Sequence, residues 1–207
     1  MLDRKKIVFV IGQESSGSRL VARACAHSLG IVDFDDWNAI GWTHSEKASV
    51  CHRSLPYGTP PKFPDITRWL EKYGPNNDLF FVITTRDVTL SDISKVEVFG
   101  KSTALVMSER HKVRAVIAQA MASGHPYTFV SYETLMFLGE PYWKELYAFL
   151  GIPLADQKFP VLKDANEKRI SEMVGEVSAS TRPTTRVKRH LRGSIRRALD
   201  WLKGEAD

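Results

Sequence analysis

A short apolar segment followed at once by a glycine-rich loop places the strongest constraint on the fold of this chain. Residues 6–11 are rich in β-branched side chains and do not alternate with polar ones, which is typical of a strand buried on both faces. The loop at residues 12–19 comes next, and apolar residues then recur at helical spacing over residues 20–29 before Gly30. A strand, a glycine-rich loop and a helix in this order predict a loop that binds phosphate.

The physical chemistry of such a loop explains this prediction. Glycines let the backbone turn tightly around an anion, the N–H groups then point inward, and the N-terminus of the following helix adds positive potential. Hydroxyl groups and a guanidinium group supply further donors. The predicted phosphate-binding residues are Ser15, Ser16, Gly17, Ser18 and Arg19. The alternative is a tight turn of small residues without a ligand.

One residue type that nucleotide-hydrolysing loops require is missing. Such a loop has a lysine followed by serine or threonine after its second glycine. Here Ser18 and Arg19 follow Gly17, which argues against ordinary ATP hydrolysis or kinase chemistry.

The order of the predicted elements indicates an α/β fold. Further strands are predicted at residues 48–53, 79–84 and 127–132, and helices at residues 65–73, 102–123 and 143–150. Strands that alternate with helices predict a three-layer sandwich with a central parallel sheet covered on both faces. Residues 33–48 are expected to be irregular. Residues 1–181 are expected to form a single domain.

The net charge of +5 lies entirely at the C-terminal end of the 207-residue chain. Residues 1–181 hold 21 basic and 21 acidic side chains, whereas residues 182–207 hold 8 basic and 3 acidic ones. Apolar residues at a four-residue spacing among arginines and lysines predict a basic amphipathic C-terminal helix. Three roles stay open for it: contact with a membrane surface through anionic lipids, binding of the cofactor or acceptor, or packing on the body. Because the folded body is neutral, nucleic acid is not an expected partner.

The N-terminal segment and the two cysteines favour a cytoplasmic protein, peripheral to a membrane if the tail binds lipid. The apolar run at residues 7–11 is too short for a membrane span or a signal peptide. Cys25 and Cys51 have no metal-binding spacing. We expect two buried free thiols rather than a disulfide.

A second candidate phosphate site follows the strand predicted at residues 79–84. Arg86 lies at the carboxyl end of this strand, where parallel sheets bind their ligands, and Ser94 lies eight residues further on. We expect Ser94 at the start of the next helix, where it would donate its hydroxyl group and expose backbone N–H groups. The alternatives are a surface turn with Ser94 as a simple helix cap, or a magnesium-binding Asp87 in a kinase-like protein.

These two constellations resemble the nucleotide-binding motifs of sulfotransferases that use 3′-phosphoadenosine 5′-phosphosulfate. Residues 15–20, Ser-Ser-Gly-Ser-Arg-Leu, are similar to the 5′-phosphosulfate loop, although Ser15 stands where the family has a lysine that helps to move the sulfuryl group. Arg86 and Ser94 match the spacing of the 3′-phosphate motif, with Asp-Val in place of the family's Asn-Pro. Residues 129–135 and 143–153 are similar to two further segments of the family, in the same order along the chain.

The resemblance also points to a general base near His52. Residues 51–56 resemble the family's Lys-Thr-His-Leu-Pro segment, in which the family lysine falls at His52 and the base histidine at Ser54. Residues two apart on a strand point to the same side, so both side chains could share the site. His52 is the predicted base because imidazole accepts a proton near neutral pH, with Glu14 and His44 as reserves. The alternative is a structural histidine at a strand end.

The resemblance implies a P-loop nucleoside-triphosphatase-like (sulfotransferase) fold and a sulfotransferase activity. The implied donor is 3′-phosphoadenosine 5′-phosphosulfate, and the acceptor is a hydroxyl group of a carbohydrate or glycolipid. No metal ion is expected, because arginines and backbone donors can meet the charges. Arg192 in the tail is similar to a basic residue that the family places against the 3′-phosphate. The alternatives are a kinase-like nucleotide phosphotransferase and a non-catalytic nucleotide-binding module.

Overall fold

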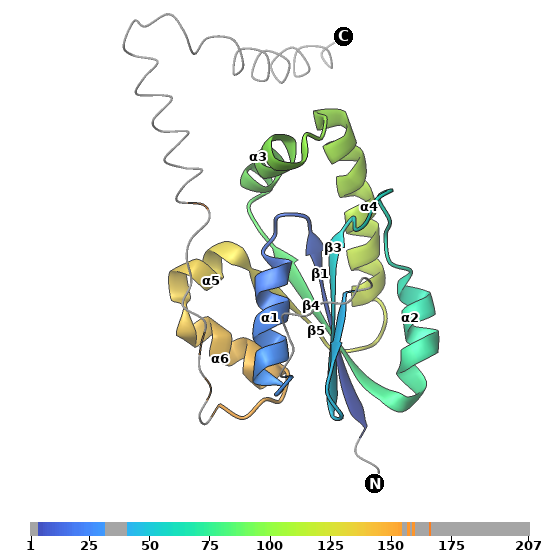
Figure 1. Ribbon diagram of the computed structural model, residues 1–207, viewed down its shortest axis with the longest axis vertical. Coiled ribbons are helices and arrows are strands. Elements are labelled where there is room, and N and C mark those ends of the chain that lie inside the picture. The colour runs from blue at the N-terminus through green and yellow to red at the C-terminus, as the bar shows by residue number, and fades with distance from the viewer. Residues whose placement is uncertain (1–3, 32–40, 155–156, 158, 160–165, 167–207) are drawn as a thin grey trace, which may run out of the picture. The chain divides into compact units, whose positions relative to one another are not determined.

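The computed structural model describes residues 4–31 and 41–154, together with residues 157, 159 and 166 (Figure 1). The backbone packs into two units, Met1–Lys163 and Asp164–Asp207. Only Asn166 is described in the second unit. The predicted tail helix, its Arg192 and the predicted boundary at residue 181 therefore lie outside the described residues.

A five-stranded sheet forms the centre of the first unit (Figure 1). Its strands are β1 (Lys5–Gln13), β2 (Trp42–His44), β3 (Ala48–Leu55), β4 (Asn77–Thr85) and β5 (Tyr127–Ser131), in the order β2-β3-β1-β4-β5. The pairs β3–β1, β1–β4 and β4–β5 are parallel, and the edge strand β2 is antiparallel to β3. The α/β prediction is confirmed, but the sheet is only mostly parallel. The antiparallel edge comes from the segment expected to be irregular, where the Ser45 N–H group donates to the Ala48 carbonyl oxygen (2.8 Å) and closes a hairpin.

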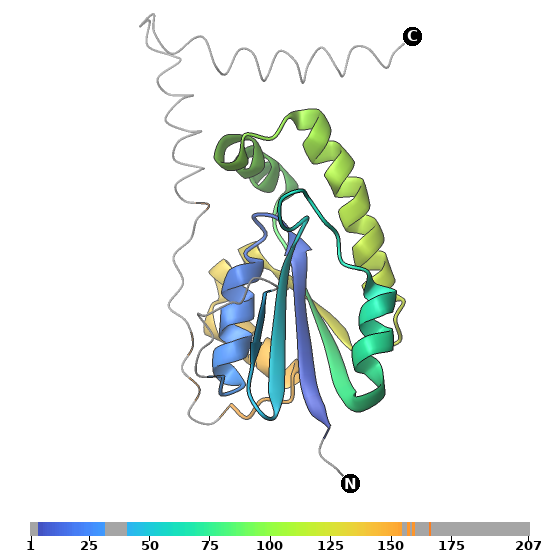
Figure 2. The ribbon, with the colours of Figure 1, turned by 45° about the vertical axis from the view of Figure 1, so that its right-hand side comes forward.

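Helices cover both faces of the sheet (Figures 1 and 2). The helices are α1 (Ser18–Ser28), α2 (Ile66–Tyr73), α3 (Val88–Phe99), α4 (Thr103–Met121), α5 (Tyr132–Leu138) and α6 (Glu140–Phe149), with a short 3₁₀ helix at Gly74–Asn76. Helices α1, α5 and α6 lie on one face, α2 and α4 lie on the other, and α3 lies beyond the carboxyl ends of the strands. This arrangement is compatible with a three-layer sandwich. In the described part of the chain, none of the helices combines the length and apolar character needed to cross a membrane.

Alternating side chains of the strands fill two different cores. On the α1 face, Val8 and Val10 of β1 belong to a largely aliphatic cluster. On the opposite face, Phe9 stacks on Trp69 of α2, with 4.5 Å between ring centroids and 12° between ring planes. Cys51 of β3 belongs to this second core, so its neighbour His52 faces α1. Cys25 and Cys51 are both buried free thiols, as predicted.

Candidate functional site

The loop between β1 and α1 lies at the carboxyl edge of the sheet, on its middle strand (Figure 1). It turns back on itself through a hydrogen bond from the Ser16 N–H group to the Gln13 carbonyl oxygen (3.0 Å). Ser15 and Gly17 have φ angles of 66° and 80°, in the left-handed region. Helix α1 starts directly after Gly17. The N-terminus of α1, which is the positive end of the helix dipole, therefore lies at the carboxyl edge of the sheet and favours an anion there.

Gly17 is fixed by its surroundings as well as by its backbone. A Cβ atom at this position would lie 2.7 Å from Cδ2 of Tyr132, closer than real Cβ contacts. Tyr132 is buried and is the first residue of α5. Helix α5 therefore packs directly against the loop, and only glycine allows this approach. Tyr132 was not singled out from the sequence, which predicted it as the last residue of the strand at residues 127–132; the strand ends at Ser131, and Tyr132 begins α5.

Arg86 and Ser94 both contact the loop. Arg86 Nη1 donates to the Ser15 carbonyl oxygen (2.9 Å), and the guanidinium group lies 4.9 Å from the centroid of the Tyr132 ring. Ser15 Oγ donates to Ser94 Oγ (3.1 Å). These two contacts join residues that are 71 and 79 positions apart in the sequence. They bring the two predicted phosphate motifs into one site.

The predicted place of Ser94 at a helix start is wrong. Helix α3 begins at Val88, and the Asp87 carboxylate caps it by accepting the Leu90 N–H group (2.9 Å). Ser94 lies in the middle of α3 and is buried. Aspartate caps a helix as well as serine does, and Asp87 follows the strand closely, so the helix starts earlier than expected. Ser94 still reaches the loop because α3 lies across the carboxyl edge of the sheet.

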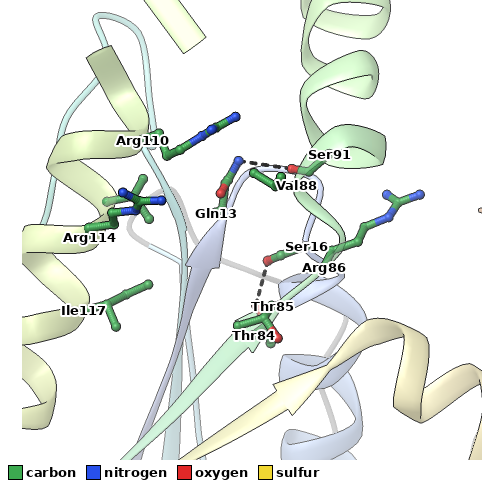
Figure 3. A pocket seen from close by; sticks show the side chains of 11 residues that line it. Gln13, Ser16, Thr84, Thr85, Arg86, Val88, Ser91, Arg110, Arg114 and Ile117 are labelled. Carbon is green, nitrogen blue, oxygen red and sulfur yellow. Dashed lines mark hydrogen bonds between the residues drawn. The ribbon is translucent and has the colours of Figure 1, made fainter. Parts of the chain in front are cut away.

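The hydroxyl groups of Ser16 and Ser18 attach the loop to its two neighbouring strands. Ser16 Oγ lies 2.7 Å from Thr84 Oγ1 of β4 (Figure 3). Ser18 Oγ lies 3.0 Å from His52 Nε2 of β3. Both serines are buried, whereas the side chain of Arg19 is exposed. From the sequence, all three residues were predicted to bind phosphate. The structure shows that Ser16 and Ser18 hold the loop in place, whereas the Arg19 side chain lies on its surface.

His52 faces α1 and is uncharged at neutral pH. Burial lowers the pKa of His52 to about 4, and the positive charges of Arg19 and Arg53 act in the same direction. Ser54 is half-buried and follows two residues later on β3, so it faces the same side. Arg53 faces away, with its guanidinium carbon 4.8 Å from the centroid of the Tyr57 ring.

Glu14 belongs to a cluster of ion pairs on the other side of the loop. We call this group the α3–α4 ion cluster; it consists of Glu14, Asp92, Lys95, Lys101, Glu109 and Arg110. Lys101 Nζ binds the Glu14 carboxylate and lies 2.8 Å from Glu109 Oε2. Burial alone would lower the pKa of Lys101, but its bonds to Glu109 and Glu14 raise it above the ordinary value. The Glu14 carboxylate is thus already engaged in an ion pair with Lys101.

A second ion pair of the cluster joins α3 to α4. Arg110 of α4 binds the Asp92 carboxylate, and Lys95 Nζ lies 3.4 Å from Asp92 Oδ1. Burial lowers the pKa of Lys95, and Asp92 partly offsets this. The side chains come from two helices whose mutual packing the sequence does not reveal, so no sequence signal singled out this cluster.

The second reserve base, His44, lies far from the loop along the sheet. It pairs in register with Ser49, close to the start of β3, and its Nδ1 atom lies 2.9 Å from Ser49 Oγ. The loop follows the opposite end of β1, opposite Leu55. The prediction of His44 as a reserve base is therefore wrong, because the hairpin carries it to the amino edge of the sheet.

Comparison with known proteins gives no relative from which a function could be transferred. No protein-family model matches the chain, and no curated protein matches it significantly. Among the described residues, no group of three or more His, Cys, Asp or Glu side chains has an arrangement that could hold a metal ion.

Proposed function

We propose that this protein is a sulfotransferase that moves a sulfuryl group from 3′-phosphoadenosine 5′-phosphosulfate to a hydroxyl group of a carbohydrate or glycolipid. The observation that carries the proposal is the contact of Arg86 and Ser94 with the loop, at 2.9 Å and 3.1 Å. A donor with a 5′-phosphosulfate and a 3′-phosphate needs two anion-binding groups side by side. One loop flanked by an arginine and a serine from the neighbouring strand and helix provides them.

Each part of the donor has a proposed partner in the described residues. The N-terminus of α1 with Gly17, Ser18 and Arg19 would hold the 5′-phosphosulfate. Arg86 and Ser94 would hold the 3′-phosphate. Tyr132 keeps Arg86 in place because its ring stacks on the guanidinium group (4.9 Å).

In the proposed transfer, one S–O bond replaces another. The acceptor oxygen attacks sulfur and forms a new S–O bond, while the bond between sulfur and the bridging phosphate oxygen breaks. The electron pair of the broken bond leaves with adenosine 3′,5′-bisphosphate, and the hydroxyl proton passes to His52. A pKa of about 4 makes free His52 a weak base. An anionic donor beside Arg19 would offset the positive potential and raise this pKa.

Two observations bear on the other candidate functions. The Asp87 carboxylate is used as the cap of α3 (2.9 Å to the Leu90 nitrogen), which weakens its case as a magnesium ligand in a kinase-like protein. Serine at position 15, in place of the family's lysine, favours the non-catalytic nucleotide-binding module. That candidate predicts nucleotide binding without transfer of sulfate.

The decisive experiment is calorimetry of the full chain with adenosine 3′,5′-bisphosphate and, separately, with ATP and magnesium. We expect the bisphosphate to bind and to do so without a metal ion. Tighter binding of magnesium-ATP would reject the sulfotransferase proposal in favour of the kinase-like one.

A matched pair of variants tests the second anion-binding group. Arg86→Ala should weaken bisphosphate binding about tenfold to a hundredfold, because a charge-assisted hydrogen bond contributes about 1.5–3 kcal/mol. Arg68→Ala, at an exposed position of α2, removes the same charge away from the loop and should leave the affinity unchanged. Equal affinities of the two variants would show that Arg86 does not bind the nucleotide.

The proposed base has a test that does not need the acceptor. In an NMR titration of the histidine rings, saturating bisphosphate should raise the pKa of His52 from about 4 toward neutrality. An unchanged pKa in the bound protein would reject His52 as the base.

A further inference from the structure

A small pocket lies on the α4 side of the loop, between the ends of β1 and β4 and the helices α3 and α4 (Figure 3). Its volume is ≈ 140 Å³, below the roughly 300–1,000 Å³ of sites that enclose a whole small molecule. It therefore has room for one end group of a larger ligand. Gln13 and Ser16 form the part of its wall that belongs to the loop.

The pocket has an excess of positive charge. Its 11 lining residues include three arginines and no aspartate or glutamate. Arg110 and Arg114 extend from α4 toward Gln13, whereas the guanidinium group of Arg86 points away from them (Figure 3). One positive charge, that of Arg110, is partly balanced by its ion pair with Asp92.

The two arginines of α4 have capacity left for a ligand. Arg110 Nε is buried and has no hydrogen-bond partner among the described residues. Arg114 is exposed, and within the described part of the chain neither an ion pair nor a hydrogen bond occupies it. Two guanidinium groups one helical turn apart suit a carboxylate, phosphate or sulfate group.

Another part of the pocket wall is apolar. Val88 of α3 and Val113 and Ile117 of α4 present aliphatic side chains to the pocket. Such a surface can contact the C–H groups of a sugar ring, whose hydroxyl groups then point elsewhere. A neutral polar ligand would leave the arginines without an anion, whereas a free inorganic ion would leave the aliphatic wall exposed to water.

We propose that this pocket binds the anionic end of the acceptor, so that the protein selects carbohydrates that carry a carboxylate, phosphate or sulfate group. This inference rests on the proposed function. Arg86 lines one end of the pocket, but its guanidinium group, the proposed partner of the donor, points away from Arg110 and Arg114 (Figure 3) and lies 4.9 Å from the centroid of the Tyr132 ring. Neither His52 nor Ser54 lines the pocket, so the anionic end occupies it while the reacting hydroxyl group stays at the loop.

The test is an NMR titration of the full chain saturated with adenosine 3′,5′-bisphosphate. The probes are glucuronate and glucose 6-phosphate, with glucose as their neutral counterpart. We expect the anionic sugars to shift signals of α4 and to bind about tenfold more tightly than glucose, with the bisphosphate still bound. Arg114→Gln should weaken their binding about threefold to tenfold, a modest loss because this side chain is exposed.

Lys112→Gln is the matched control, since it removes one charge from the same helix, where Lys112 lies over the Phe63 ring (5.8 Å) outside the pocket. Its binding of the anionic sugars should equal that of the unmodified protein. An equal loss in both variants would mean general attraction of anions, and displacement of the bisphosphate would assign the pocket to the donor. Either result overturns the inference, as does equal binding of glucose and the anionic sugars. Failure of the bisphosphate itself to bind would instead reject the proposed function, and the acceptor assignment with it.

Discussion

The two sides of the loop are held in different ways. Toward α1 and α5, the loop is fixed by hydroxyl groups, an aromatic ring and a close glycine contact, with Ser18 bound to His52 (3.0 Å). Toward α3 and α4, it is fixed by the α3–α4 ion cluster, in which Lys101 joins Glu14 of the loop to Glu109 of α4. Two hydroxyl groups of α3 add to this: Ser91 Oγ donates to the Glu14 carbonyl oxygen, and Ser94 Oγ accepts from Ser15 Oγ. The first side leaves a helix N-terminus for an anion. The second uses its charges internally and leaves a separate pocket with arginines.

This difference has an energetic consequence. Contacts between uncharged groups change little with pH or salt, whereas buried ion pairs become costly when one partner is removed. The ion-cluster side should therefore be the more sensitive to single charge deletions. The α1 side should be sensitive to shape, and to pH only through His52.

The largest effect is expected on the ion-cluster side. Lys101→Met should lower the free energy of unfolding by about 3–5 kcal/mol, because it leaves the carboxylates of Glu14 and Glu109 without their lysine. Lys144→Met is the control, since its ion pair with Glu140 is about half exposed and should contribute less than about 1 kcal/mol. Urea unfolding of both variants measures the difference. Similar losses would show that the cluster does not stabilise the loop.

The next effect is the acid sensitivity of the α1 side. The pKa of His52 is about 4 in the folded protein, below the ordinary value of 6.5. As the pH falls, His52 is therefore protonated in the unfolded chain before it is protonated in the folded protein. The contribution of uncharged His52 to the free energy of unfolding is present above pH 6.5 and is lost as the pH falls to 4. It amounts to about 3 kcal/mol, at 1.36 kcal/mol per pH unit.

The measurement compares the unfolding free energy of the unmodified protein and His52→Gln between pH 7 and pH 4. The loss on acidification should be about 3 kcal/mol smaller in the variant, because glutamine does not titrate. At pH 8 the two proteins should differ only by the contact of residue 52 with Ser18. Parallel pH profiles would contradict a buried, uncharged His52.

A somewhat smaller effect is expected from the close contact on the same side. Gly17→Ala should lower the free energy of unfolding by about 2–3 kcal/mol, since it combines a left-handed backbone (φ 80°) with a clash against Tyr132. Gly30→Ala also has a left-handed φ of 70°, but no atom lies within 4 Å of its Cβ position, so about 1 kcal/mol is expected. Thermal unfolding distinguishes the two variants. Equal decreases in melting temperature would mean that α5 does not pack closely against the loop.

The smallest effect concerns the bond that joins the two predicted phosphate motifs. Ser15→Ala removes the half-buried hydroxyl group that donates to Ser94 (3.1 Å) and should cost about 0.5–1 kcal/mol. Urea unfolding measures this change. A loss as large as that of Lys101→Met would show that this hydroxyl contact with α3 stabilises the loop as much as the ion cluster does, which contradicts the greater sensitivity expected for charge deletions.

The sequence predicted the local elements of the site well, because their signals lie within a few residues. The β-branched run of β1, the glycines of the loop and the helical spacing of α1 all follow from backbone preferences. The same holds for β4 and Arg86 at its end. The start of α3 was misplaced, since Asp87 and Ser94 are both good caps and only the structure shows which one is used.

By itself, the sequence determined that the chain forms an α/β fold, with a glycine-rich loop after one buried strand and an arginine at the end of another. Only the tertiary structure decided how these parts meet. Arg86 reaches Ser15 because β4 pairs with β1. His44 is excluded because a hairpin carries it to the far edge. Both placements depend on which strands pair and on how α3 and α4 pack against the sheet. Packing between segments that are distant in the sequence leaves no short-range pattern in the chain.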